Sequence, residues 1–292
     1  MISFIICSVD PQRARETEEN IRRTSGLAAP EIIIHDNRTL RWGLCRTYNH
    51  YSERASGEIL CYMHEDVLFR TDDWAPKITG FYAAHPDAGV VGFLGSQYKT
   101  AAPSAVGSMP RYQMGSLIQQ SPDGTKYHMQ RSGEGDFSRV VQVDGLCMFV
   151  PKAVWAAHRF DAELFDSFHL YDLDFCIQIA QDFKNYVCHS VVVEHASEGS
   201  HNDDWYRYTA LFIEKWKDRL PLMCIPMTHR EIREAEAYAA YKFYKFVLIH
   251  RRTRWLGYAR EVFRRDATLL YRIKILKYRL LPPSKGSRSR FT

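Results

Sequence analysis

Short apolar stretches alternate with helix-compatible stretches along the first part of the chain. Four apolar runs, each short enough for a strand, occupy residues 2–9, 31–36, 58–63 and 88–94, and the second of them is rich in β-branched residues. Polar, helix-compatible sequence separates the first three runs. Strands that alternate with helices are typical of a mostly parallel sheet with helices on both faces. The pattern therefore predicts an α/β domain.

The middle of the chain departs from this alternation. Residues 97–138 are punctuated by Gly, Ser and Pro and have poor periodicity, which predicts a long, flexible excursion over one face of the domain. Strand-like sequence returns at 140–150 and again at 189–194. From 203 to 219 apolar residues recur at three- and four-residue spacing, which predicts an amphipathic helix. We therefore place the end of the α/β domain near residue 220.

The C-terminal segment 221–292 differs from the rest in charge. Between Lys242 and Arg290 there are 15 Lys and Arg against two acidic residues, whereas the remainder of the chain has 24 basic and 32 acidic residues. Within 261–281 an apolar stripe recurs at helical spacing, with basic residues off it: Val262, Leu269, Ile273, Leu276 and Leu280. We expect basic amphipathic helices over 229–281 that rest on an anionic membrane surface, and disorder over about the last ten residues. The alternative is that the stripe packs on the α/β domain or on a second copy, as in a homodimer.

Composition excludes several classes of protein. An apolar share of 46% is enough for a packed core, and no stretch approaches the roughly 18–20 apolar residues of a membrane span. The N-terminus has no basic region and reaches Asp10 too early for a signal peptide. Seven cysteines, an odd number without a CxxC pair, indicate reduced thiols. We therefore expect a cytoplasmic protein, bound peripherally to the inner face of the membrane by its basic helices.

Polar residues gather where the predicted strands end. Ser8 and Asp10 follow the first strand, Asp36 ends the second, and His64-Glu65-Asp66 end the third. Because the carboxyl ends of parallel strands share one edge of a sheet, ligands bind there. Residues 64 and 66 point to the same side of an extended chain, so they can face one divalent cation and a diphosphate. A polar strand end that faces water is the plain alternative.

Two further clusters carry candidate chemistry. Asp172 and Asp174 lie at the start of a predicted helix, where a carboxylate is either a general base or a helix cap. His195 ends the last predicted strand and is either a metal ligand or a surface histidine.

Together these segments resemble family 2 glycosyltransferases of the GT-A fold, over residues 2–220. The stretch that leads to the metal-binding Asp-x-Asp motif of that family is similar to Arg46-Thr47-Tyr48-Asn49, Ala55-Ser56-Gly57-Glu58-Ile59 and His64-Glu65-Asp66. Residues 143–149 resemble the acceptor-side strand, 168–176 the helix start with the catalytic carboxylate, and 193–200 the C-terminal metal histidine and its loop. The subgroup it resembles most was first described from streptomycin biosynthesis, and its metal motif also begins with His.

The resemblance implies a metal-dependent, inverting transfer of a sugar from a nucleotide-diphosphate sugar to an acceptor hydroxyl. Asp66 and His195 would hold Mn²⁺ or Mg²⁺, and Asp172 would be the general base. It implies donor contacts for Ser8, Asp10, Asp36, Asn49, His64 and Asp66, and acceptor-side or supporting roles for Asp144, Gly145, Asp174, Ser200 and Trp205. Residues 97–138 would close over the donor. A glycan or lipid-linked acceptor in bacterial surface polysaccharide assembly would explain a membrane-binding tail.

The sequence departs from the family at three places. His64 replaces the first acid of the metal motif, which leaves Asp66 as the main carboxylate ligand. Tyr171 stands where a Glu often precedes the catalytic Asp. Val9 and Asp10 replace the aromatic residue and Asn that often follow the first strand.

Other functions fit the sequence less well. A sugar nucleotidyltransferase usually has a Gly-rich basic loop after its first strand, and this chain has Ser8-Val9-Asp10-Pro11-Gln12 there. A nucleic-acid-binding protein would use the basic tail, but the acidic remainder of the chain would repel a phosphate backbone, so we expect no nucleic-acid partner. An inactive scaffold is disfavoured because Asp66, Asp172 and His195 are all present.

Overall fold

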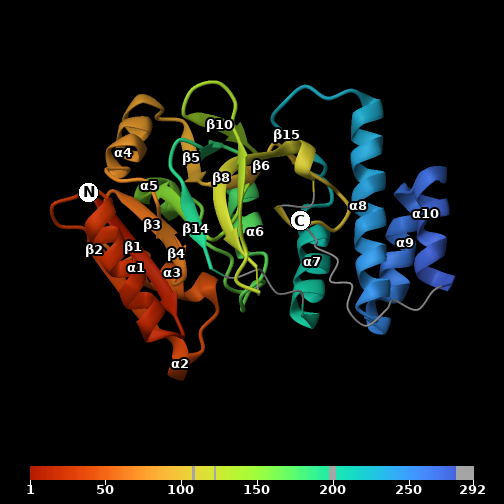
Figure 1. Cartoon of the computed structure of the whole chain (residues 1–292), viewed down its shortest axis with the longest axis horizontal. Helices are drawn as coiled ribbons and strands as arrows, with labels where there is room; N and C mark the ends of the chain where they lie inside the picture. The colour runs from red at the N-terminus through yellow and green to blue at the C-terminus, as the bar shows by residue number, and fades with distance from the viewer. Residues whose placement is uncertain (107–108, 122, 197–201, 281–292) are drawn as a thin grey trace.

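A seven-stranded mixed sheet forms the core of the α/β part of the molecule, on the left of Figure 1. The computed structural model describes residues 1–106, 109–121, 123–196 and 202–280. The strand order is β10 (Phe137–Val140), β13 (Lys184–Cys188), β5 (Ala88–Gly92), β12 (Cys147–Pro151), β3 (Ile59–His64), β1 (Ile2–Ser8), β2 (Glu31–Asp36). Five of these strands share one direction, and β10 and β12 run against them. The predicted α/β class with a mostly parallel sheet is confirmed.

Register brings the candidate strand ends together. In the parallel pairs of β1, Ser8 lies opposite Asp36 and Cys7 lies opposite His64. The carboxyl ends of β1, β2 and β3 therefore meet at one edge of the sheet.

Helices cover both faces of this sheet, because alternate residues of its strands point to opposite sides. On one face the ring of Phe4 contacts Trp74, which directly precedes α4 (Ala75–Ala84). On the other face the ring of Tyr62 contacts Tyr48 of α3 (Leu44–Ser52) and Phe175 of α6 (Tyr171–Ile179). The remaining helices up to residue 216 are α1 (Pro11–Thr24), α2 (Asn37–Leu40), α5 (Lys152–Ala157) and α7 (Asp203–Trp216).

A second sheet lies beside the first. Its order is β11 (Gln142–Val143), β6 (Leu94–Ser96), β8 (Gln113–Gln120), β14 (Val193–His195), β4 (Val67–Phe69), with β9 (Lys126–Arg131) paired to β8. Residues 97–138 contribute to these strands, as well as β7 (Tyr98–Lys99) and the 3₁₀ turn η2 (Pro110–Tyr112). The expectation of a long flexible loop is therefore wrong for most of this segment. Strand β8 was missed because it is paired on both sides, so its apolar residues do not alternate, and β9 is an almost wholly polar outer strand.

The C-terminal segment forms the predicted helices, which stand together on the right of Figure 1. They are α8 (His229–Ile249), η3 (Thr253–Trp255), α9 (Leu256–Asp266) and α10 (Leu269–Leu280); β15 (Leu222–Met223) precedes them and pairs with β7. The expected single stripe over 261–281 is corrected, because the helix ends at Asp266 and Ala267 is extended. Val262 is buried in a cluster with Ala235 and Ala239 of α8, whereas Leu269, Ile273 and Leu276 of α10 are exposed.

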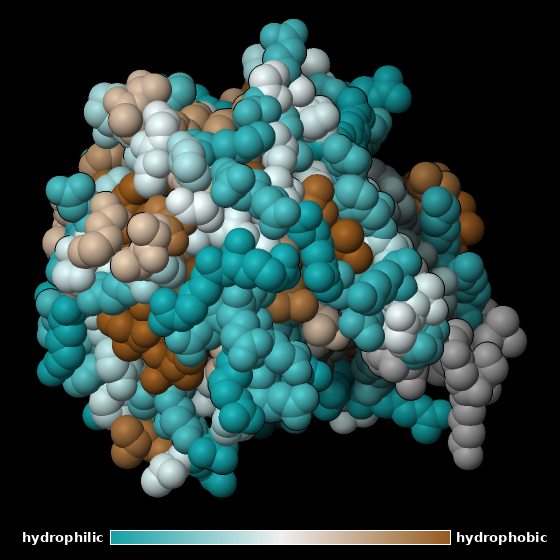
Figure 2. Space-filling view, turned by 60° about the vertical axis from the view of Figure 1, so that its left-hand side comes forward, coloured by the Kyte–Doolittle hydropathy of each residue, from teal (hydrophilic) through white to brown (hydrophobic). Residues whose placement is uncertain are grey.

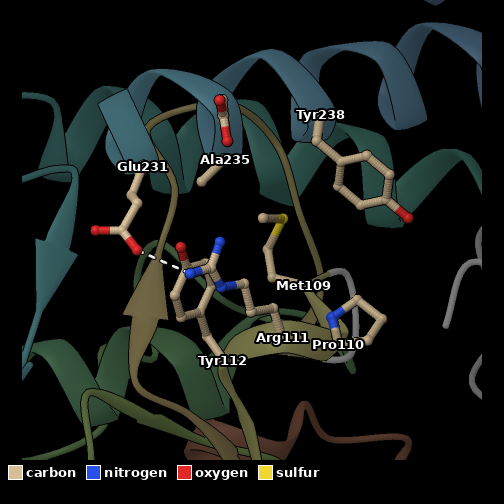
Figure 3. A pocket seen from close by; sticks show the side chains of 8 residues that line it. Met109, Pro110, Arg111, Tyr112, Glu231, Ala235 and Tyr238 are labelled. Carbon is tan, nitrogen blue, oxygen red and sulfur yellow. Dashed lines mark hydrogen bonds and ion pairs between the residues drawn. The ribbon is translucent and has the colours of Figure 1, made fainter. Parts of the chain in front are cut away.

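The helices α8–α10 are joined to the α/β part by polar contacts as well as by apolar packing. Glu236 of α8 accepts hydrogen bonds from the Tyr98 hydroxyl (2.6 Å) and from the backbone N–H groups of Ala101 and Ala102. Figure 3 shows a neighbouring pocket of about 220 Å³ in which Arg111 reaches Glu231 at 2.8 Å. The first residues of the 97–138 segment are therefore bound to α8.

On the side shown in Figure 2 the surface is mostly hydrophilic, with apolar residues in separate patches. Among the described residues, no helix combines the length and apolar character that crossing a bilayer requires.

Candidate functional site

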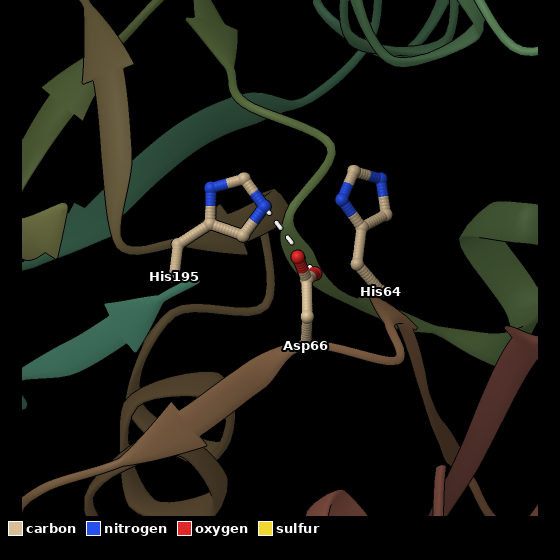
Figure 4. Close-up of side chains that lie close together, drawn as sticks. All are labelled: His64, Asp66 and His195. Carbon is tan, nitrogen blue, oxygen red and sulfur yellow. Dashed lines mark ion pairs between the residues drawn. The ribbon is translucent and has the colours of Figure 1, made fainter. Parts of the chain in front are cut away.

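Three side chains from separate strand ends converge at one edge of the second sheet: His64, Asp66 and His195 (Figure 4). His64 ends β3, and Asp66 lies in the turn before β4. Antiparallel pairing places His195 of β14 opposite Val67, next to Asp66. His195 Nε2 lies 3.4 Å from Asp66 Oδ1, and one ligand atom from each of the three residues lies within 4.8 Å of the others.

Tyr171 fixes the orientation of His64. Its hydroxyl donates to the carbonyl oxygen of Gly145 at 3.0 Å and lies 2.9 Å from His64 Nε2. Because a phenol has one hydrogen to donate, it must accept from an Nε2–H of His64. The Nδ1 lone pair of His64 then faces Asp66 and His195, as the close-up shows (Figure 4). Burial, reinforced by repulsion from His195, lowers the pKa of His64 to about 4, so the imidazole is neutral at pH 7.

Gln119 of β8 plays the matching part for His195. Its Oε1 lies 3.3 Å from His195 Nδ1, and its amide nitrogen donates to the backbone carbonyl of His195 at 3.2 Å. A proton on Nδ1 leaves the Nε2 lone pair directed at Asp66. Metal-binding histidines are oriented in this way by partners behind them. Sequence reasoning missed Gln119 because it missed the strand that carries it.

Glu65, in the turn between β3 and β4, binds the loop after β1 and is not part of this cluster. Its carboxylate accepts from the Ser8 hydroxyl and from the backbone N–H groups of Val9 (2.9 Å) and Asp10 (2.8 Å). It therefore shapes the loop after β1.

The loop after β1 also directs a cation toward the cluster. Asp10 caps α1 by accepting from the N–H groups of Gln12 and Arg13. The half-exposed guanidinium of Arg13 lies 3.5 Å from Asp66 Oδ2. Sequence reasoning missed Arg13. Its position in the first turn of the helix that follows the first strand is the feature that could have indicated it.

Asp172 lies close to the turn between β11 and β12. Its Oδ2 accepts from the backbone N–H of Gly145 at 2.9 Å, in the first turn of α6. Position 145 requires glycine, because a Cβ there would lie 2.2 Å from the Tyr171 hydroxyl oxygen. Burial, followed by repulsion from Asp144, raises the pKa of Asp172 to about 7, and burial also raises the pKa of Asp144. A carboxylate that gains a proton near neutral pH suits a general base.

The structure gives Asp174 a different role from its neighbour. Its side chain is 2% exposed and pairs with Lys215 at 2.8 Å. Trp216 Nε1 donates to it at 2.8 Å and Gln178 at 2.7 Å. All of these partners belong to α6 and α7, so Asp174 fastens these two helices together and does not share the Asp172 environment.

The other predicted site residues do not join the cluster, and one of them lies outside the described residues. Asn49 binds the Phe160 backbone through both its oxygen and its nitrogen, and also accepts from Trp155. Trp205 is buried against Phe243 and Phe246 of α8. Asp36 is exposed, caps α2 and pairs with Arg38, which lowers its pKa to about 2. Ser200 lies outside the described residues.

The three-residue cluster fits a divalent transition metal. Two imidazole nitrogens and one carboxylate are ligands that such ions accept, and ligands on one octahedral ion lie about 3 Å apart when adjacent. The 3.4 Å separation of His195 and Asp66 is close to this value. Beside the cluster the half-exposed ring of Phe168 lies 5.5 Å, centroid to centroid, from that of His64.

Comparison with known proteins agrees with this arrangement. The chain belongs to the family described as "Glycosyltransferase like family", whose model matches residues 3–216. The GT-A fold that the sequence resemblance implied is confirmed. A comparison with curated protein sequences finds no significant match.

Solved structures that are similar in fold include the following two. GalNAc-T7 with UDP, GalNAc and Mn²⁺ aligns with a TM-score of 0.52 and 10% identity over 98% of this chain and 59% of its own. The mannosyltransferase PcManGT from Pyrobaculum calidifontis, in complex with GDP-Man and Mn²⁺, aligns with a TM-score of 0.52 and 14% identity over 97% of this chain and 81% of its own. This chain therefore spans less than two thirds of the length of GalNAc-T7.

Proposed function

We propose that this protein transfers a sugar from a nucleotide-diphosphate sugar to an acceptor hydroxyl, with inversion at the anomeric carbon and with a divalent metal ion. One observation carries the proposal. Hydrogen bonds join His64 to the Tyr171 hydroxyl and that hydroxyl to the Gly145 carbonyl, while the N–H of the same Gly145 binds Asp172. Candidate metal ligands and a candidate base are therefore held in one rigid frame. The streptomycin-type subgroup, with its His-first metal motif, remains part of this proposal.

The residues present fit the metal that both similar structures contain. His64, Asp66 and His195 would hold Mn²⁺ or Mg²⁺, which would neutralise negative charge on the departing diphosphate. Two imidazole ligands favour Mn²⁺, since Mg²⁺ prefers oxygen ligands. His64 enters this set in addition to the pair that the resemblance implied.

The donor would lie along the shared edge of β1, β2 and β3. Ser8 and Asp36 are register partners at this edge and would contact the nucleoside. Arg13 already reaches Asp66 and would pair with the diphosphate. Asn49 and Asp10 contribute indirectly, because their side chains hold the local backbone.

Asp172 would remove the proton from the acceptor hydroxyl as that oxygen attacks the anomeric carbon. The Gly145 N–H bond holds its carboxylate in place. The neighbouring Asp144 keeps its proton affinity high. Inversion follows when the hydroxyl attacks from the side opposite the diphosphate.

We also propose that the acceptor is a glycan or a lipid-linked molecule of bacterial surface polysaccharide assembly, met at the inner face of the cytoplasmic membrane. Support comes from the basic tail and from the exposed apolar residues of α10. The sugar nucleotidyltransferase alternative has less support. In this chain the backbone N–H groups of the loop after β1 bind the Glu65 carboxylate, whereas that class uses a Gly-rich basic loop there to bind a triphosphate.

The test is a transfer assay with a panel of nucleotide sugars and hydroxyl acceptors, with Mn²⁺ and with chelator. NMR of the product would give the anomeric configuration. Metal-dependent transfer with inversion supports the proposal. Transfer with retention would remove Asp172 from the role of base.

A further inference from the structure

A basic pocket opens between the three C-terminal helices, away from the metal cluster. It encloses about 310 Å³, and its walls combine three arginines with apolar side chains: Tyr244, Arg260, Phe263, Arg264, Arg272, Ile275 and Leu276. Nothing in the proposed transfer reaction uses it.

The arginines of this pocket are not neutralised by the protein. Among the described residues, none of the ion pairs involves Arg260, Arg264 or Arg272; the nearby Asp266 pairs with Arg265. Arg272 donates to the backbone carbonyls of Ala267 and Arg264, which fixes α10 against the end of α9. Three cations thus surround a pocket that is large enough for a phosphate group.

An exposed apolar stripe borders the pocket. Leu269, Ile273 and Leu276 follow one face of α10 and are 73%, 59% and 45% exposed, and Leu276 also lines the pocket. Ile275, on the other side of the helix, is 1% exposed and joins the core. The stripe and the arginine pocket are therefore parts of one surface.

We infer that this surface docks on an anionic bilayer, with the phosphate of an anionic phospholipid bound by Arg260, Arg264 and Arg272 and the α10 stripe lying among the acyl chains. The inference rests on the membrane location in the proposed function and names the site responsible. Guanidinium groups bind phosphate oxygens in a bidentate manner. An apolar face flanked by basic residues is typical of a helix in a lipid interface.

Charge complementarity favours a bilayer over a second copy of the chain. From Leu256 to Leu280 there are seven Lys and Arg against two acidic residues. A twofold dimer would bring this surface against itself and oppose like charges. An anionic leaflet supplies the opposite charge and also accepts the apolar stripe.

The experiment is co-sedimentation of the full-length protein with phosphatidylcholine vesicles and with vesicles that also contain phosphatidylglycerol, at fixed ionic strength. The pocket variant is Arg260→Gln/Arg264→Gln, because no hydrogen bond or ion pair between described residues involves either of these side chains. The matched control is Arg219→Gln/Arg233→Gln, which removes the same charge from two exposed positions outside the pocket. Leu269→Gln/Ile273→Gln tests the stripe. Glycerol 3-phosphate and inorganic phosphate serve as soluble competitors.

We expect the wild-type protein to bind the anionic vesicles only. Its affinity for them should fall about thirty-fold in the pocket variant and only a few-fold in the control variant. Loss of binding in the stripe variant, with little competition by the soluble phosphates, identifies the ligand as a lipid in a bilayer. Equal losses of vesicle binding in the pocket and control variants would overturn the assignment of the pocket as the phosphate site, because the attraction would then depend on net charge alone. Displacement by inorganic phosphate would overturn the lipid assignment. Absence of vesicle binding by the wild type would overturn the membrane part of the proposed function without touching the transfer reaction.

Self-association is measured in parallel by light scattering. A mass that falls from dimer to monomer in the stripe variant, with vesicle binding unchanged, would show that α10 covers a second copy and would overturn the inference.

Discussion

The hydroxyl of Tyr171 lies 2.9 Å from Nε2 of His64, the first residue of the metal cluster. The same hydroxyl donates to the Gly145 carbonyl, so the hydrogen bond sets the His64 tautomer as well as its orientation. Tyr171, which directly precedes the candidate base Asp172, is therefore hydrogen-bonded to the candidate metal ligand His64. An ionised Glu, which the resemblance leads one to expect at position 171, could accept from His64 but could not donate to the Gly145 carbonyl oxygen.

Tyr171→Phe tests this relationship. We expect Mn²⁺ affinity to fall by about tenfold or more, because loss of a supporting partner costs that much at metal sites. Electron paramagnetic resonance of bound Mn²⁺ measures it directly, without activity. The control is Tyr62→Phe, which removes another buried phenol hydrogen bond, to Ser52, away from the cluster. Unchanged Mn²⁺ affinity in Tyr171→Phe would mean that His64 is not a ligand held by Tyr171.

Asp172→Asn separates chemistry from binding. We expect kcat to fall by about 10²–10⁴-fold, with donor affinity nearly unchanged, because a general base acts in the transition state. Asp182→Asn, at an exposed carboxylate just beyond α6, should leave both parameters unchanged. Steady-state kinetics with the true acceptor decide the matter, and near-wild-type turnover in Asp172→Asn would place the base elsewhere.

The pH profile should report the same carboxyl group. Burial and Asp144 raise the pKa of Asp172 to about 7, and only the deprotonated form accepts a proton. We expect kcat/KM to rise about tenfold per pH unit below 7 and to level off above it. A flat profile between pH 5 and 8 would contradict the assignment.

Asp174→Asn should affect stability and leave the chemistry intact. It breaks a buried ion pair with Lys215, and we expect the free energy of unfolding to fall by about 3 kcal/mol. Urea unfolding measures the loss, and kcat per folded molecule should remain near that of the wild type. A loss of kcat without a loss of stability would return Asp174 to the catalytic site.

The C-terminal ends of the first strands were predictable from the sequence. Each of these apolar runs ends at or just before an acidic residue, which indicates where the strand reaches the surface of the protein. Asp66 and His195 meet in space as the resemblance required, although 129 positions apart in the chain, because β4 and β14 pair. His64 joins them because the turn between β3 and β4 places Asp66 beside the end of β3.

Residues that act through side-chain partners were harder to predict. Asp172 and Asp174 look equivalent in the sequence, and only the packing of α7 shows that Asp174 is fully engaged by Lys215 and Trp216. Gln119 was hidden in β8, a strand whose apolar residues do not alternate with polar ones. Val262 and Leu269 belong to one apparent stripe, but the break after Asp266 buries one and exposes the other.

Nucleotide binding linked to the metal tests the central claim most directly. Calorimetric titration with UDP and GDP, with Mn²⁺ and after chelation, should show one nucleotide that binds only when Mn²⁺ is present. The affinity should fall by about tenfold or more in Asp66→Asn and stay unchanged in the exposed control Asp72→Asn. Nucleotide binding that is indifferent to both Mn²⁺ and Asp66 would contradict a metal-dependent glycosyltransferase site at His64, Asp66 and His195.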